Sequence, residues 1–183
     1  MKITNPWTTK STQTAYENPW IKIEHNEVVN PSGGDGIYGV VRFKNQAIGI
    51  VPIDEEGNTY LVGQWRYPLQ EYHWEIPEGG CPKGENPLDT AKRELKEETG
   101  LVAEQWEFLL DFHLSNSVTD EYGVAYVARG LRQEEATPEA TEDITVRKVP
   151  LQTAVQMMLN GEIKDALSVL ALQRVALLGL NQR

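Results

Sequence analysis

The chain has 183 residues, 40% hydrophobic and 24% charged, a length and balance typical of one globular domain with a small appendage. Its formal net charge of −10 argues against a nucleic-acid partner, because an acidic surface repels polyanions and no large Lys/Arg cluster interrupts it. A protein with this net charge can bind an anionic small molecule only where bound cations reverse the sign of the local electrostatic field.

The cysteine content and the lack of apolar runs bear on where the protein works. The single cysteine, Cys81, excludes an internal disulfide and a zinc site built on cysteines. Residues 1–13 are polar and lack the apolar core of a secretory signal. No apolar run approaches the roughly 20 residues needed to cross a bilayer. We therefore expect a soluble, cytoplasmic protein with no membrane partner.

The N-terminal part of the chain predicts an arm followed by antiparallel strands. Residues 1–19 are polar, contain two prolines and show neither strand nor helix period, so we expect an extended arm. Short segments rich in β-branched and aromatic residues follow, separated by Gly, Pro, Asn and Asp, which favour hairpin turns. The expected strands are Ile21–Val29, Ile37–Phe43, Ala47–Ile53 and Thr59–Trp65.

The hydrophobic period changes after Asn86, and we expect a helix over residues 87–99. Asn86 is a favourable N-cap, Pro87 suits the first helical position, and Gly100 is a common stop. The apolar residues that recur at helical spacing, and so predict the buried face, are Leu88, Ala91 and Leu95.

The C-terminal part of the chain mixes strands, one loop and helices. An acidic, proline-containing stretch at Gln133–Glu142 reads as a loop. The expected strands around it are Phe108–Leu114, Gly123–Ala128 and Ile144–Val149, and the expected helices are Ala154–Leu159 and Ala166–Leu178.

Three glutamates stand out in the capped helix. Glu94, Glu97 and Glu98 are spaced i, i+3 and i+4, which places their carboxylates on one side of the helix. One interpretation is a solvated charged face, which is common on surface helices. The other is a divalent metal site, because a hard cation relieves the repulsion and prefers carboxylate oxygens. The neighbouring Arg93 and Glu85 favour the metal interpretation.

The segment from Gly79 to Leu101 resembles the Nudix box at every defined position. The matching residues are Gly79, Glu85, Arg93-Glu94-Leu95, Glu97-Glu98 and Gly100-Leu101. The resemblance implies an α/β fold, an α/β/α sandwich with a mixed β-sheet and a loop-helix-loop catalytic element. It also implies hydrolysis of a nucleoside diphosphate linked to another group.

The same resemblance assigns metal ligands. It makes Glu94 and Glu98 direct ligands of Mg²⁺ or Mn²⁺, and Glu97 a ligand or a residue that supports one. The backbone carbonyl of Glu78, just before the first glycine of the box, is a further ligand, a role that needs no particular side chain. Such cations clamp the phosphate oxygens and lower the pKa of a bound water.

Two catalytic roles are less closely defined. Arg93 is expected to orient a carboxylate through bidentate hydrogen bonds, with Glu85 as the nearby acid. A general base is expected from residues 133–142, where Ala140 stands at the position of a catalytic glutamate in some relatives and Glu139 is adjacent. The base itself is not assigned.

Outside the box, several short segments resemble the ADP-ribose pyrophosphatase and nucleotide-sugar hydrolase branch of the family. They are Gln64-Trp65-Arg66, Trp74-Glu75-Ile76-Pro77, Thr119-Asp120-Glu121, Glu142-Asp143-Ile144 and Gly161-Glu162-Ile163-Lys164-Asp165-Ala166. The likeness implies that Arg66 contacts phosphate, that Glu121 contacts substrate or metal-bound water, and that Glu142 is a further metal ligand. The alternatives are a surface ion pair of Arg66 with Glu71 or another exposed acid, and a solvated Glu142. Asn116 is a substrate-binding candidate, at a position where ADP-ribose hydrolases usually have proline, so adenosine specificity is weakened.

The expected activity is metal-dependent hydrolysis of ADP-ribose or a nucleotide sugar to a nucleoside monophosphate and a sugar phosphate. Two alternatives stay open: another substrate, such as a dinucleoside polyphosphate or a modified nucleoside triphosphate, and a nucleotide-sensing module without turnover. We divide the chain into residues 1–45, an arm and antiparallel strands, and residues 46–183, the hydrolase domain. Relatives imply a homodimer formed through residues 1–45.

Overall fold

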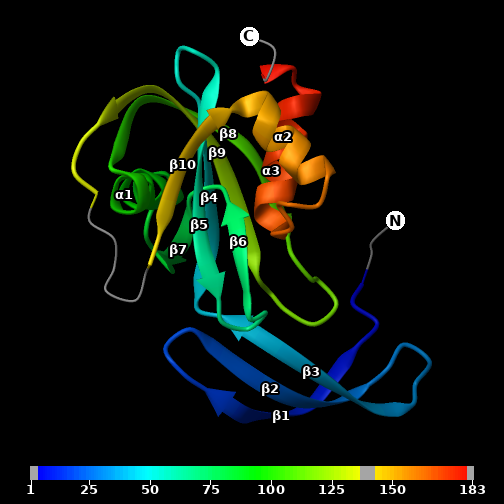
Figure 1. Cartoon of the computed structure of the whole chain (residues 1–183). Coiled ribbons are helices and arrows are strands. Elements are labelled where there is room, and N and C mark those ends of the chain that lie inside the picture. The colour runs from blue at the N-terminus through cyan, green and yellow to red at the C-terminus, as the bar shows by residue number, and fades with distance from the viewer. Residues whose placement is uncertain (1–3, 137–142, 181–183) are drawn as a thin grey trace.

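The computed structural model of the chain describes residues 4–136 and 143–180. In the described part of the chain, seven strands precede the first helix, three strands follow it, and two helices come last (Figure 1). In chain order they are β1 (Thr8–Glu17), β2 (Ile21–Val29), β3 (Asp35–Phe43), β4 (Asn45–Pro52), β5 (Asn58–Arg66), β6 (Glu71–Glu75), β7 (Glu78–Pro82), α1 (Pro87–Thr99), β8 (Leu101–His113), β9 (Tyr122–Gln133), β10 (Thr145–Pro150), α2 (Leu151–Leu159) and α3 (Ala166–Leu177).

Two of the three sheets lie between helices. The mixed sheet has the order β7-β4-β9-β8, with β4 and β9 parallel and the other neighbours antiparallel. The second sheet, β10-β5-β6, is antiparallel. Helix α1 contacts β7, β4 and β8 on one side, whereas α2 and α3 cover the other side (Figure 1). The expected α/β/α sandwich with a mixed sheet is therefore confirmed.

Strand β4 shows how the sequence builds both halves of this core. Ile48 and Ile50 are fully buried in the cluster under α1, whereas Val51 belongs to the cluster that α2 and α3 cover. A strand buried on both faces needs an almost continuous apolar run, and Ala47–Ile53 supplies one. Because β4 is packed on both faces, it holds β7, the edge strand that pairs with it next to α1, in a fixed position.

The N-terminal residues form a third sheet, β1-β2-β3, which extends away from the sandwich (Figure 1). The expectation of an extended arm over residues 1–19, outside the strands, is wrong for Thr8–Glu17, because these residues form β1 and pair with β2. All ten residues of β1 are exposed, so neither face selects apolar residues and no strand period appears in its sequence. Val41 and Tyr38 hydrogen-bond to Val118 and Ser117, which attaches this sheet to the loop before β9.

The helix expected over residues 87–99 is confirmed as α1. The side chain of Asn86 accepts a hydrogen bond from the backbone N–H of Leu88, and Gly100 ends the helix with φ +70°. Ala91 and Leu95 are fully buried, as their spacing predicts. Other elements begin earlier than expected: β8 begins at Leu101 rather than Phe108, and α2 begins at Leu151 rather than Ala154.

Strands β6 and β7 were not expected from the sequence. Gly79 and Gly80 have low β propensity and lie in β7 because β4 pairs with them. In the described part of the chain, no helix is long and apolar enough to span a membrane.

Candidate active site

Two of the three glutamates of α1 point into the protein. The exposed fraction is 7% for Glu94 and 3% for Glu98, and both lie on the side of α1 that faces β7. Oε2 of Glu98 accepts a hydrogen bond from the backbone N–H of Glu78 at 3.0 Å. A solvated helix face does not describe these two residues, because ionised carboxylates are rarely buried without paired or coordinated charge.

Arg93 partly neutralises the group. Its Nη2 lies 2.7 Å from Oε1 of Glu94, and its Nη1 donates to Oε2 of Glu97 at 2.6 Å. Nη2 also donates to the carbonyl of Gly80. Burial opposes the charge of Arg93, but Glu94 and Glu97 raise the pKa of the guanidinium above its ordinary value. Arg93 therefore holds the glutamates and the β7 backbone in one arrangement.

The expected pairing of Arg93 with Glu85 is wrong. Glu85 instead accepts a hydrogen bond from Oγ1 of Thr90 at 3.3 Å. The reason is the helical geometry: residues at i and i+4 are neighbours on the helix surface, so Glu97 is in reach of Arg93, whereas Glu85 lies before the first turn.

The residues around Gly79 fit a hard divalent cation. A Cβ added to Gly79 would overlap the carboxyl group of Glu94, so only glycine lets the strand lie this close to the carboxylate. The hydrogen bond from Glu78 to Glu98 places a peptide group beside the second carboxylate. Carboxylate and carbonyl oxygens are the donors that Mg²⁺ and Mn²⁺ prefer.

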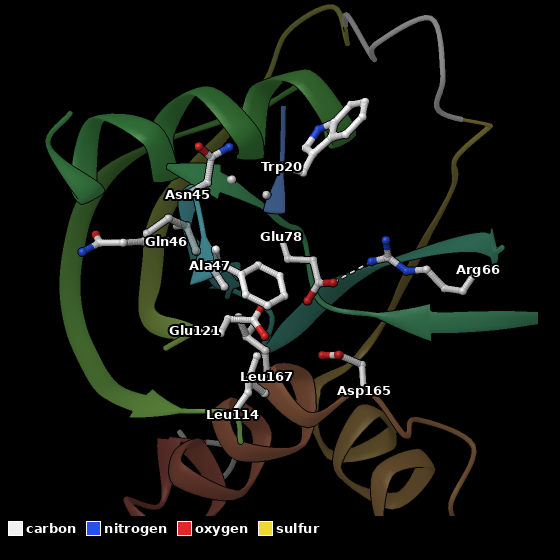
Figure 2. A pocket seen from close by; sticks show the side chains of 14 residues that line it. Trp20, Asn45, Gln46, Ala47, Arg66, Glu78, Leu114, Glu121, Asp165 and Leu167 are labelled. Atoms are coloured by element: carbon white, nitrogen blue, oxygen red, sulfur yellow. Dashed lines mark hydrogen bonds and ion pairs between the residues drawn. The ribbon is translucent and has the colours of Figure 1, made fainter. Parts of the chain in front are cut away.

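A cavity of about 420 Å³, here called the central cavity, opens beside this group (Figure 2). Gly79 and Gly80 are among the residues that line it. Arg66 and Glu121 contribute side chains to the lining (Figure 2). The residues that line it are Trp20, Phe43, Asn45, Gln46, Ala47, Ile48, Arg66, Glu78, Gly79, Gly80, Leu114, Glu121, Asp165 and Leu167. Asn116 is exposed in the turn before β9 and is not part of the lining.

Arg66 is held by buried acids. Its Nε donates to both carboxylate oxygens of Glu75, its Nη2 also pairs with Glu75, and Nη2 donates to Glu78 at 2.6 Å (Figure 2). The alternative of a pair with Glu71 or another exposed acid is wrong, because the side chain of Glu75 is only 3% exposed. Burial opposes the charge of Arg66, but Glu75 and Glu78 raise its pKa. Within the described residues, Nη1 has no hydrogen-bond partner, so it is free to bind an anion.

The sequence did not predict a role for three acidic side chains in or next to the central cavity. Glu75, Glu78 and Asp165 have carboxylate oxygens within 4.8 Å of one another, and Arg66 supplies positive charge among them. Burial, then the charges of Asp165 and Glu75, raise the pKa of Glu78 well above its ordinary value. Burial, then Asp165, raise the pKa of Glu121. The signals for Asp165 were its place in a segment that resembles the start of the C-terminal helix of the branch, and its position before α3, where it caps the helix by accepting a hydrogen bond from the backbone N–H of Ser168.

The expected loop residues cannot be placed. Glu142, Glu139 and Ala140 lie outside the described residues. The proposed metal-ligand role of Glu142 and the source of the general base therefore stay predictions.

Comparisons with known proteins show which family the chain belongs to. The profile of the NUDIX domain matches residues 44–170, and that of the nucleoside diphosphate sugar hydrolase N-terminal domain matches residues 7–41. The methanol dehydrogenase activator of Bacillus methanolicus is 34% identical over 92% of this chain and 92% of its own length. The ADP-ribose pyrophosphatase of Mycobacterium tuberculosis is 34% identical over 88% of this chain and 79% of its own length.

A solved structure supports the fold. A crystal structure described as an ADP compounds hydrolase superposes with a TM-score of 0.87, at 22% identity, over 100% of this chain and 98% of the other. Because the profile covers well over half of the sequence and the identities exceed 30%, the chain belongs to the Nudix pyrophosphatase family of enzymes.

Proposed function

We propose that this enzyme hydrolyses the diphosphate bond of a nucleoside diphosphate sugar, such as ADP-ribose, to a nucleoside monophosphate and a sugar phosphate. The observation that carries the proposal is the pair of buried carboxylates, Glu94 and Glu98, beside a cavity that also presents the unpaired Nη1 of Arg66. The printed names of relatives, which include two ADP-ribose pyrophosphatases and an ADP-sugar pyrophosphatase, support the same substrate class.

Glu94, Glu98 and the carbonyl of Glu78 would hold Mg²⁺ or Mn²⁺, with Glu97 as a ligand or a support. When bound, the metal lowers the pKa of a water and neutralises charge on the phosphates. Arg66 would bind a phosphate oxygen through Nη1 and so orient the diphosphate.

The remaining side chains position the substrate. Trp20 and Phe43 line the central cavity and offer aromatic surfaces for a nucleobase. Glu121, held neutral over a wider pH range by its raised pKa, can contact a sugar hydroxyl or a metal-bound water. Arg93 keeps Glu94 and Glu97 in place, because it bonds to both.

A panel of diphosphate compounds tests this function. ADP-ribose, nucleotide sugars, diadenosine polyphosphates and modified triphosphates are incubated with the protein and Mg²⁺, and phosphomonoester release is measured. We expect nucleotide sugars to be cleaved fastest and a chelator to abolish the reaction.

Two variants complete this test. Glu98→Gln should lower the rate by about 100-fold or more, since it removes a ligand charge. Glu107→Gln, which changes an exposed acid on β8, is the control and should leave the rate unchanged. Full activity in chelator or in Glu98→Gln contradicts the metal mechanism, and an inactive wild type favours a sensing module.

We also propose that residues 1–45 form a dimerisation unit. Their three-stranded sheet leaves β1 exposed along its whole length, and Tyr16, Trp20 and Ile37 are exposed apolar residues of this region. Strand edges and apolar side chains of this kind commonly pair with another chain. Light scattering after size exclusion should give the mass of a dimer at micromolar concentration, and the mass of a monomer would contradict the proposal.

A further inference from the structure

A second cavity, here called the lateral cavity, lies beside the central cavity. Its volume is about 460 Å³, and it shares Arg66, Glu78 and Asp165 with the central cavity. These three residues therefore lie on the border that the two spaces share, and Figure 2 shows the guanidinium of Arg66 and the carboxylate of Asp165 beside the carboxylate of Glu78. The other residues that line the lateral cavity are Pro68, Leu69, Glu71, His73, Glu75 and Lys164.

The lateral cavity contains a buried imidazole that lacks a hydrogen bond. The side chain of His73 is 7% exposed, and its Nε2 is buried without a hydrogen-bond partner. An unsatisfied buried polar atom costs free energy and calls for an explanation. Its neighbour is Oε2 of Glu71, 3.5 Å away, on a side chain that is 61% exposed. Within the described residues, the side chain of Glu71 has no other ion pair or hydrogen bond, so it can turn into solvent and open Nε2 to a ligand.

The same cavity has an unpaired cation. Lys164 is exposed just before α3, and its ammonium has no ion pair or hydrogen bond with any described residue. Many other cations of this acidic chain are paired, as Lys92 is with Asp89 and Lys148 with Asp54. Arg66 and Lys164 are the two cations that line the lateral cavity, among four carboxylates. Because Arg66 is already paired with Glu75 and Glu78, Lys164 is the cation with no acidic partner in the part of the chain that the structure describes.

The two cavities differ in the groups they offer. The central cavity has the aromatic side chains of Trp20 and Phe43, which suit a flat base, whereas no aromatic ring other than the imidazole lines the lateral cavity. The lateral cavity instead has cations for phosphate oxygens, carboxylates that accept hydrogen bonds from hydroxyls, and a buried imidazole. This set matches a sugar phosphate better than a nucleoside.

We propose that the lateral cavity binds the sugar-phosphate half of the substrate, with Lys164 on the phosphate and His73 on a sugar hydroxyl. The inference rests on the proposed function, because it divides that substrate between two cavities. It makes Lys164 and His73 determinants of which sugar is accepted, and neither residue belongs to the Nudix box.

Calorimetric binding of the separate products tests the proposal without turnover. Ribose 5-phosphate, glucose 1-phosphate and AMP are titrated into the protein in Mg²⁺. Lys164→Gln should weaken sugar-phosphate binding about fivefold to tenfold, the effect of one charge-assisted hydrogen bond, and leave AMP binding within twofold. Lys83→Gln, which removes the charge of an exposed lysine before α1, is the matched control and should change neither. Equal weakening of both ligands, unchanged sugar-phosphate binding in Lys164→Gln, or no binding of either sugar phosphate by the wild type overturns the proposal.

Imidazole resonances give an independent measurement. The chain has three histidines, so His73→Gln assigns the signal of His73. A sugar phosphate should shift that signal and AMP should not, whereas the reverse result overturns the proposal. Failure of the proposed function would appear separately, as an absence of phosphomonoester release by the wild type.

Discussion

The backbone of Gly79 lies against the carboxylate of Glu94, so closely that a Cβ on Gly79 would overlap Cδ and both oxygens of Glu94. The contact joins the first glycine of the box to its first helical glutamate. Glu94 has little room to move away, because it is 7% exposed and Arg93 holds it. Position 79 therefore needs glycine because the carboxylate of Glu94 lies against it, and not because the backbone turns there.

We expect Gly79→Ala to displace Glu94 and weaken metal binding. The loss should be about 10-fold to 100-fold in activity at limiting Mg²⁺, since groups that position a ligand have effects of this size. Part of the loss should disappear at high Mg²⁺, and a Mg²⁺ titration of the rate checks this. Gly39→Ala, in an exposed strand position with open space around it, is the control. An unchanged Mg²⁺ dependence in Gly79→Ala would show that the contact has no role in the metal site.

Arg66 should contribute to both stability and binding, and a second substitution separates the two. Arg66→Ala leaves the buried Glu75 without its counterion, so we expect a loss of about 3 kcal/mol in unfolding free energy. Adding Glu75→Gln should recover much of that loss, because it removes the uncompensated charge. The double variant should nevertheless keep a KM raised by roughly tenfold, since the phosphate contact is still missing. Thermal denaturation and steady-state kinetics measure the two effects, and a normal KM in the double variant would remove Arg66 from the substrate site.

Ser168 joins α3 to the strand end that precedes the site. Its Oγ accepts a hydrogen bond from the backbone N–H of Ile76 at 3.0 Å, and both residues are buried. Ser168→Ala should lower the unfolding free energy by about 2 kcal/mol, because it leaves a buried donor unsatisfied. This corresponds to roughly 4–8 °C in Tm. Ser117→Ala, in an exposed turn, is the control, and equal Tm values for the two variants would contradict the importance of this bond.

The elements that the sequence predicts well are those with local signals. The N-cap Asn86 and the stop at Gly100 act within the helix itself, so the bounds of α1 could be read from neighbouring residues. The buried run of β4 is equally local. By contrast, β1 is exposed on both faces and is a strand only through its pairing with the next strand, β2. Strand β7 contains two glycines and depends on pairing with β4, which lies much earlier in the chain. No pattern within these segments reports such pairing.

The residues of the site also differ in how far the sequence predicts them. The spacing of Glu94, Glu97 and Glu98 placed three carboxylates together, but it did not show that Glu94 and Glu98 are buried or that Arg93 pairs with both Glu94 and Glu97. The carboxylates of Glu75 and Asp165 lie close together because α3 packs against the sheets, which brings together residues 90 positions apart. Such long-range contacts have no signal in the spacing of residues.

Glu78 should make the metal-free protein less stable as the pH rises. Burial, then Asp165 and Glu75, raise the pKa of its carboxyl in the folded state, so the folded protein holds a proton that the unfolded chain releases at lower pH. The stability is therefore complete below the unfolded pKa of 4.5 and is lost as the pH rises through the higher folded pKa. The buried Oε2 of Glu78 has no hydrogen-bond partner that would offset this cost.

Glu78→Gln keeps the backbone carbonyl and removes the charge. In chelator, we expect this variant to raise Tm by roughly 2–4 °C at pH 8, the shift that about 1 kcal/mol gives in a chain of this size, and to leave it unchanged near pH 4. Glu107→Gln, an exposed acid, should show no such pH dependence. Thermal denaturation of wild type and both variants between pH 4 and pH 8 measures the difference. A Glu78→Gln variant that is less stable than wild type at pH 8 would mean that the ionised carboxylate stabilises the fold through Arg66 more than its burial and acidic neighbours oppose it.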